Sequence, residues 1–407
     1  MVALHDAKPP RARLRCEIGL VAPARSCDPS VRVLDVDLFD RQVIEDPYPL
    51  YAALRAHGEP VRSADGHWIL CRYDDVRQAL VDHGRFSSAE TNGATRRRLP
   101  VLVGTDPPEH TRLRRLTSKH LVSDTAQTCE PQIERRIEAL VAETLEAGRI
   151  EAVGDLCAVV PVIALAQLMG VEEEVLAGLC NGSPAQHRIG RRKVLADFFR
   201  QARGAACSDP DRRDLLSAVS QPTDTGDVLS EEEFVVFCVL LLAAGVDSVR
   251  DLLANLLVEL ARTPAVWEEV SASPEVLGSV AEEAMRFVSP VQGVFRTATA
   301  DVGDGAIKGG DRVLLLIGSA NRDERSWEDA ARLVPRRYAG ARPPVAHLGL
   351  GSGVHACAGA TLARFEVTTV LRQLVQQRAH LTLTGPVVRG RNPYFRTVRR
   401  LEMRITT

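Results

Sequence analysis

A glycine-rich segment that ends in a cysteine is the strongest chemical signal in this sequence. It spans residues 347–359 and reads HLGLGSGVHACAG, and helical spacing begins directly after it. Glycines at alternate positions disfavour both strand and helix, and they let the backbone approach a large, flat group. Cys357 stands just before the N-terminus of the predicted helix. We expect the free N–H groups and the dipole of that helix to lower the pKa of the thiol, which makes the sulfur a strong iron ligand.

A nucleotide-binding loop is the alternative explanation for so many glycines. Such a loop needs Lys and then Ser or Thr after the glycines, whereas this one continues as His355-Ala356-Cys357. The segment instead resembles the haem-ligand loop of the cytochrome P450 family, Phe-Gly-x-Gly-x-His-x-Cys-x-Gly. It departs from that pattern only at Leu350, which replaces the aromatic residue.

The resemblance continues from Asp46 to the C-terminus and is to soluble bacterial members of the family. It implies a mainly α fold with a small β portion (α+β), in which a triangular helical body holds haem b. The haem would lie between the long central helix and the helix after the cysteine loop. Cys357 would bind the iron, and Leu350, Gly351 and Gly359 would lie against the ring, where Gly359 removes a Cβ that would strike it.

Haem carries two propionates, which need cationic or hydrogen-bonding partners. His110 and Arg114 are four residues apart and therefore share one face of a predicted helix. Taken alone, this pair would be an ordinary solvated first turn. The resemblance to the family's His-x-x-x-Arg helix implies that the pair binds propionates together with Arg296 and His355.

A second charged group is predicted to be structural. Glu283 and Arg286 lie among apolar residues on a predicted helix, so we expect burial and complete pairing. Arg337 resembles the third member of this network in the family. The network would brace the loop that carries Cys357.

The long helix predicted at 230–261 begins with a capping box formed by Ser230 and Glu233. A glycine inside a helix costs about 1 kcal/mol relative to alanine, so Gly245 predicts a local opening of the helix where a diatomic ligand can lie. The resemblance implies that Asp247 and Ser248 deliver protons for O–O cleavage. The alternative is a polar patch. The family usually has Thr at the position of Ser248, so coupling of electrons to product is expected to be looser.

Substrate and partners are less closely specified. Motif details resemble members that oxidise para-substituted benzoates, but Glu90 and an apolar helix stand where those members bind the carboxylate, unless Arg96, Arg97 or Arg98 replaces that anchor. We therefore expect a small or medium, apolar or aromatic substrate. The predicted pocket residues are Ala243, Ala244, Val291, Val294 and Phe295.

No flavin or iron–sulfur motif is present, so electrons are expected from a ferredoxin-type donor with its reductase. The predicted docking face for the ferredoxin is Arg112, Arg115 and Lys119. Absence of a signal peptide predicts a cytoplasmic location without membrane contact. The net charge of −2 disfavours nucleic-acid binding.

The chain of 407 residues can bury a large core, and its nine irregularly spaced cysteines do not form a disulfide pattern. We expect a loose arm at 1–35 and one catalytic domain at 36–407. Predicted strands are a hairpin within 61–72 and segments 294–303, 312–316, 380–384 and 396–405. Two predicted helices open at Asp46 and at Asp74. The others are 108–123, 128–147, 155–169, 190–206, 211–219, 230–261, 264–271, 274–288 and the segment from just after Cys357 to about Gln377.

These features together favour a haem-thiolate monooxygenase that inserts one oxygen atom from O2 into an organic substrate by hydroxylation or O-dealkylation. A second possibility is oxidative coupling, ring formation or peroxide-driven oxidation on the same haem. A haem gas sensor is the alternative from another class, and the lack of an output domain disfavours it.

Overall fold

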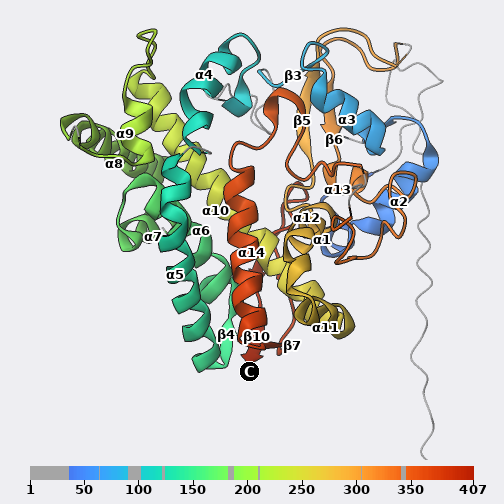
Figure 1. Cartoon of the computed structure of the whole chain (residues 1–407). Helices are drawn as coiled ribbons and strands as arrows, with labels where there is room; N and C mark the ends of the chain where they lie inside the picture. Colours follow the sequence, from blue (N-terminus) through green and yellow to red (C-terminus); the bar gives the residue numbers. More distant parts are fainter. Residues whose placement is uncertain are drawn as a thin grey trace, which may run out of the picture.

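The computed structural model describes residues 36–63, 65–89, 102–121, 124–181, 188–209, 211–303, 305–340 and 345–407. The arm expected at 1–35 lies outside the described residues. Helices dominate the described chain, and the helical body tapers toward the C-terminal strands (Figure 1). No helix in these ranges has the length and apolar content needed to cross a membrane.

The longest helix, α10 (Glu231–Arg262), forms the centre of the body, as predicted. Its capping box is present, because the Glu233 N–H donates to Ser230 Oγ at 3.2 Å and the Ser230 N–H donates to Glu233 Oε2 at 2.7 Å. The helix contributes buried side chains to both large hydrophobic clusters, Phe234 to one and Leu253 to the other. Burial on both sides therefore places α10 in the interior.

Most of the other helices lie where the sequence predicts them. The remaining helices are α1 (Arg41–Glu45), α2 (Tyr48–His57), α3 (Tyr73–Val81), α4 (Glu109–Thr117), α5 (Asp124–Ala147), α6 (Val159–Met169), α7 (Glu173–Asn181), α8 (Arg188–Ser208), α9 (Leu215–Ser220), α11 (Pro264–Ala272), α12 (Leu277–Val288), α13 (Ile317–Ala320) and α14 (Ala360–Gln376). The helix predicted at 108–123 is wrong in its second half, because α4 ends at Thr117 and a 3-10 turn follows. The short helices α1, α7 and α13 were not predicted.

The strands form three small sheets. The largest has the order β1-β2-β6-β5-β3, and the predicted hairpin is its β1–β2 edge, with Val61 opposite Ile69. The second has the order β4-β10-β7, and the third pairs β8 with β9. The strands are β1 (Val61–Arg62), β2 (Trp68–Leu70), β3 (Phe86–Ser87), β4 (Arg149–Glu151), β5 (Val294–Ala298), β6 (Arg312–Leu315), β7 (His380–Leu383), β8 (Val388–Arg389), β9 (Val398–Arg400) and β10 (Glu402–Thr406).

The single strand predicted at 396–405 is wrong, because β9 and β10 belong to different sheets. The break falls at Leu401, which is fully buried. Its N–H donates to the side chain of Glu151 at 2.7 Å instead of to a neighbouring strand. The predicted pairing of the segments near 380 and 405 is confirmed, since Ile405 lies opposite Leu381.

Candidate active site

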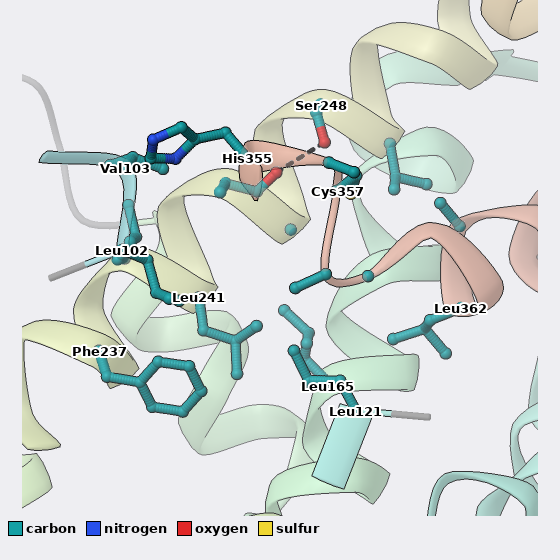
Figure 2. Close-up of a pocket in the computed structure, with 18 of the residues that line it drawn as sticks. Leu102, Val103, Leu121, Leu165, Phe237, Leu241, Ser248, His355, Cys357 and Leu362 are labelled. Carbon is teal, nitrogen blue, oxygen red and sulfur yellow. Dashed lines mark hydrogen bonds between the residues drawn. The ribbon is translucent and has the colours of Figure 1, made fainter. Parts of the chain in front are cut away.

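One cavity between α10 and α14 brings together most of the residues that the cysteine motif predicts. The space inside it, including solvent at its open side, is about 1010 Å³. Figure 2 shows Cys357 and His355 on one wall and apolar side chains such as Phe237 and Leu362 around them. The predicted residues that line it are His110, Arg114, Ala244, Gly245, Ser248, His355, Cys357 and Gly359.

The cysteine loop is held in shape by local backbone bonds. Gly351 and Gly353 have φ values of +71° and +68°, in the left-handed region that favours glycine. The Cys357 N–H donates to the carbonyl of Leu350 at 2.7 Å. Leu350 and Gly351 therefore form the turn behind the cysteine and do not line the cavity.

A Cβ on Gly349 would overlap the backbone carbonyl of Met285 on α12. Gly349 thus allows the loop to pack directly on α12. A Cβ on Gly359, by contrast, would meet no atom within 4 Å, because that position opens onto the cavity. The missing side chain at Gly359 therefore leaves room in the cavity for a bound group.

The expected pKa of Cys357 is wrong in direction. Burial raises the pKa of the thiol, and the Gly359 N–H together with the charges of Arg114 and Arg364 lowers it by less. The residue is exposed only in the sense that it borders the cavity. Local helix-end effects are therefore outweighed by desolvation, and a bound metal ion would have to displace the thiol proton.

Two histidines meet at one end of the cavity. The rings of His110 on α4 and His355 in the cysteine loop have centroids 4.4 Å apart. The Nε2 atom of each is buried and, within the described ranges, has no hydrogen-bond partner. His355 Nε2 lies 4.0 Å from Asp106, beyond hydrogen-bond distance. Burial, followed by the charge of Arg296, lowers the pKa of His355 to about 3, and burial also lowers the pKa of His110.

Two arginines complete this end. Arg114 lines the cavity, and burial lowers its pKa. Arg296 on β5 is 8% exposed and, among the described residues, donates only to the carbonyl of the adjacent Phe295, at 2.8 Å. Burial lowers the pKa of Arg296 to about 10. Neither guanidinium forms an ion pair with a carboxylate in the described part of the chain.

This donor set fits a haem. Buried cations and imidazole N–H groups without acceptors cost free energy unless an anion satisfies them, and two propionates would do so. The sulfur, the open position at Gly359 and the apolar walls match a flat, largely apolar ring with a central metal. Cys357 would bind the iron, and His110, Arg114, Arg296 and His355 would bind the propionates.

On the α10 side the hydroxyl of Ser248 borders the cavity and donates to the carbonyl of Ala244 at 2.6 Å (Figure 2). Asp247 is 61% exposed and pairs with Arg250 at 2.6 Å. The predicted helix opening is wrong, since α10 is continuous through Gly245. A Cβ on Gly245 would lie 3.1 Å from a methyl group of Leu165 on α6, so close helix packing explains this glycine.

The predicted charged network is brought together at α12. Glu283 and Arg286 have 0% side-chain exposure and form two hydrogen bonds of 2.7 Å, and Arg337 Nε donates to Glu283 Oε1 at 3.0 Å. Arg286 also donates to the carbonyl of Asn321, whose side chain accepts the Leu348 N–H at 2.7 Å. The network therefore connects directly to the start of the cysteine loop.

Comparisons with known proteins agree with this geometry. The family model of cytochrome P450 matches residues 272–384. The chain is 32% identical over its whole length to the beta-dihydromenaquinone-9 omega-hydroxylase of Mycobacterium tuberculosis, covering 84% of that protein. It is also 32% identical to the cytochrome P450 CYP199A2 of Rhodopseudomonas palustris, over 92% of this chain and 94% of the relative.

Among solved structures, cytochrome P450 CYP109Q5 from Chondromyces apiculatus superposes with a TM-score of 0.82 at 29% identity, over 92% of this chain and 98% of that one. The chain belongs to the cytochrome P450 family. It is therefore a haem-dependent oxidoreductase of the monooxygenase class, and the predicted fold is confirmed.

Of the five predicted substrate-pocket residues of this P450, one borders the cavity. Ala244 lines the cavity, whereas Ala243, Val291, Val294 and Phe295 do not. Phe295 packs edge-on against Tyr394, with centroids 5.0 Å apart. Side chains alternate along a strand, so Phe295 points to the face of β5 opposite to that of Arg296.

The sequence missed the apolar walls of the cavity, because their only signal is helical spacing shared with every core residue. These walls are Leu102, Val103, Leu121, Leu165, Phe237, Leu240, Leu241, Val249 and Leu362. It also missed Glu366 on α14, which borders the same cavity and is 2% exposed. Glu90, Arg96, Arg97 and Arg98 lie outside the described residues.

The expected ferredoxin-docking face is changed by ion pairing. Arg112 pairs with Glu233 at 2.8 Å and with Asp227 at 3.1 Å, and Arg115 pairs with Asp227 at 2.9 Å. These two guanidinium groups connect α4 to the start of α10. Of the three predicted cations, Lys119 is exposed and forms no salt bridge with any described residue, so the face carries less free charge than the sequence suggests.

Proposed function

We propose that this P450 uses haem b, bound through Cys357, to insert one oxygen atom from O2 into a small or medium, apolar or aromatic substrate by hydroxylation or O-dealkylation. The observation that supports it best is the convergence of unsatisfied donors on one cavity. The buried Nε2 atoms of His110 and His355 have no partner among the described residues, and Arg114 lines the same cavity beside the sulfur of Cys357. Haem held through the Cys357 sulfur would supply the oxygen activation.

The chain's own residues would orient the cofactor and move protons. His110, Arg114, Arg296 and His355 would hold the propionates through charge-assisted hydrogen bonds. Asp247 reaches solvent and can exchange protons with it. Ser248 Oγ already donates to a backbone carbonyl, so its lone pairs can accept a hydrogen bond on the cavity side.

The apolar walls support the proposed substrate class, because an unpaired polar group would be costly there. One solved relative, CYP109E1 from Bacillus megaterium, has been crystallised in complex with corticosterone. It is 26% identical to this chain and superposes with a TM-score of 0.80, over 89% of this chain and 99% of that one. Oxidation of a para-substituted benzoate is the narrower form of the proposal, and it requires a carboxylate anchor. A ferredoxin with its reductase as electron source and a cytoplasmic location are further parts of the proposal.

The test is the absorption spectrum of the reduced, haem-loaded protein under carbon monoxide. We expect the red-shifted band of a thiolate-ligated haem, its loss in Cys357→Ala, and its retention in the matched variant Cys207→Ala, which removes an exposed cysteine. A wild-type protein without this band would refute the assignment of Cys357.

Oxidative coupling or ring formation is a second candidate, favoured by serine in place of threonine at 248. Isotopically labelled O2 separates the two reactions once a substrate is found. Hydroxylation places label in the product, and O-dealkylation places it in the carbonyl fragment that leaves, whereas coupling leaves every organic product unlabelled.

A further inference from the structure

A single carboxylate, that of Glu282 on α12, joins the two ends of the segment that carries Cys357. His347, at the start of the cysteine loop, lies with Nε2 3.0 Å from Glu282 Oε2. Arg364, in the second turn of α14, donates through Nε to Oε1 and through Nη2 to Oε2 at 3.2 Å. One side chain thus connects residues on both sides of the cysteine.

The histidine in this arrangement has a defined orientation. His347 Nδ1 accepts the Gly349 N–H at 3.2 Å, so the proton of a neutral ring is on Nε2 and is donated to Glu282. The ring is 8% exposed and packs edge-on against Tyr338. Both ring nitrogens are therefore satisfied, and rotation of the ring would break two hydrogen bonds.

The charges in this cluster act on the sulfur. Burial opposes ionisation of Glu282, but the bonds from His347 and Arg364 outweigh it and lower its pKa to about 2. The side chain of Arg364 is 44% exposed, and the residue lies on α14, the helix that starts three residues after Cys357, so its positive charge is held at the helix end next to the sulfur. The sulfur therefore experiences a positive guanidinium whose position and net charge are controlled by Glu282.

We propose that Glu282 is a positioning residue that sets the electrostatic field at the Cys357 sulfur, and hence the reduction potential of the haem iron, by holding and partly neutralising Arg364. This inference rests on the proposed binding of haem iron by Cys357. The two adjacent glutamates would then have different roles. Glu283 pairs with arginines inside the buried network, whereas Glu282 contacts residues on both sides of Cys357.

Two single variants separate this role from a purely mechanical one. Glu282→Gln keeps the shape and removes one negative charge, so the reduced haem is stabilised and its potential shifts upward. Arg364→Gln removes one positive charge, so the potential shifts downward. A bond that only stiffens the loop would give shifts of the same direction in both variants, because both weaken the same contact.

The experiment is spectroelectrochemical titration of the haem-loaded protein, with Glu275→Gln as control. Glu275 is an exposed carboxylate 3.4 Å from Arg336, so its variant makes the same charge change away from the cysteine segment. We expect opposite shifts for Glu282→Gln and Arg364→Gln, a potential near wild type for Glu275→Gln, and restoration toward wild type in Glu282→Asp, which retains the charge.

The outcomes distinguish the two proposals. If the wild-type carbon monoxide spectrum lacks the thiolate band, the proposed function fails and the potentials have no bearing on Glu282. A normal wild-type band with unchanged potentials, or with shifts of equal sign in Glu282→Gln and Arg364→Gln, overturns the role of Glu282 alone.

Discussion

Glu366 on α14 is a buried carboxyl group beside the cavity, and its ionisation should make the stability of the protein depend on pH. The residue is 2% exposed. Burial alone raises its pKa from 4.5 to about 8, without an opposing charge. The folded protein therefore keeps this proton over a range in which the unfolded chain has released it.

The direction in which stability changes with pH follows from the number of protons bound by each state. Between pH 4.5 and about 8 the folded state binds more protons at Glu366 than the unfolded state does, so the free energy of unfolding falls as pH rises through this range. At 1.36 kcal/mol per pKa unit, Glu366 lowers the free energy of unfolding by about 3 kcal/mol between about pH 5.5 and about pH 8. Above the folded pKa the contribution becomes constant.

Replacing Glu366 with Gln removes the titration and keeps the size of the side chain. Urea unfolding of the haem-loaded protein is followed by far-ultraviolet circular dichroism. The free energy of unfolding of Glu366→Gln minus that of wild type should be about 3 kcal/mol larger at the upper of these two pH values than at the lower. Glu138→Gln, at an exposed glutamate on α5, is the matched control and should show no such gain. A wild-type to Glu366→Gln difference that is the same at every pH would refute the reasoning.

Three further substitutions test the cavity and its loop. Gly359→Ala should leave the free energy of unfolding of the haem-free protein within about 0.5 kcal/mol of wild type, because the added Cβ meets no protein atom. The same Cβ would occupy space proposed for the haem, so haem retention, measured by transfer to apomyoglobin, should weaken; unchanged retention would contradict the proposed fit. Gly349→Ala should lower the free energy of unfolding by on the order of 3 kcal/mol, because its Cβ overlaps the Met285 carbonyl. Thermal unfolding measures this loss, and a melting temperature near that of wild type would show that the contact relaxes. Ser248→Ala should lower product formed per electron consumed, with haem content unchanged, and an unaltered yield would exclude its hydroxyl from proton delivery.

Local sequence was sufficient for features whose partners lie a few residues apart. The cap of α10 pairs Ser230 with Glu233, and the turn at Gly351 and Gly353 precedes a helix that starts at Ala360. Backbone conformation and nearest-neighbour hydrogen bonds decide such features, so residue type and spacing predict them. The same reasoning failed at Gly245, where the determining neighbour, Leu165, is on another helix.

The sequence by itself determined that Cys357 ends a glycine loop before a helix, and that a long capped helix runs through the core. Only the tertiary structure decided that His110 lies against His355, that Phe295 turns away from the cavity, and that Glu282 joins His347 to Arg364. These contacts connect residues tens to hundreds of positions apart, and helical or strand periodicity carries no information on which distant side chain will be the partner. The raised pKa of the thiol has the same origin, because desolvation depends on everything that packs around the sulfur and not on the helix that follows it.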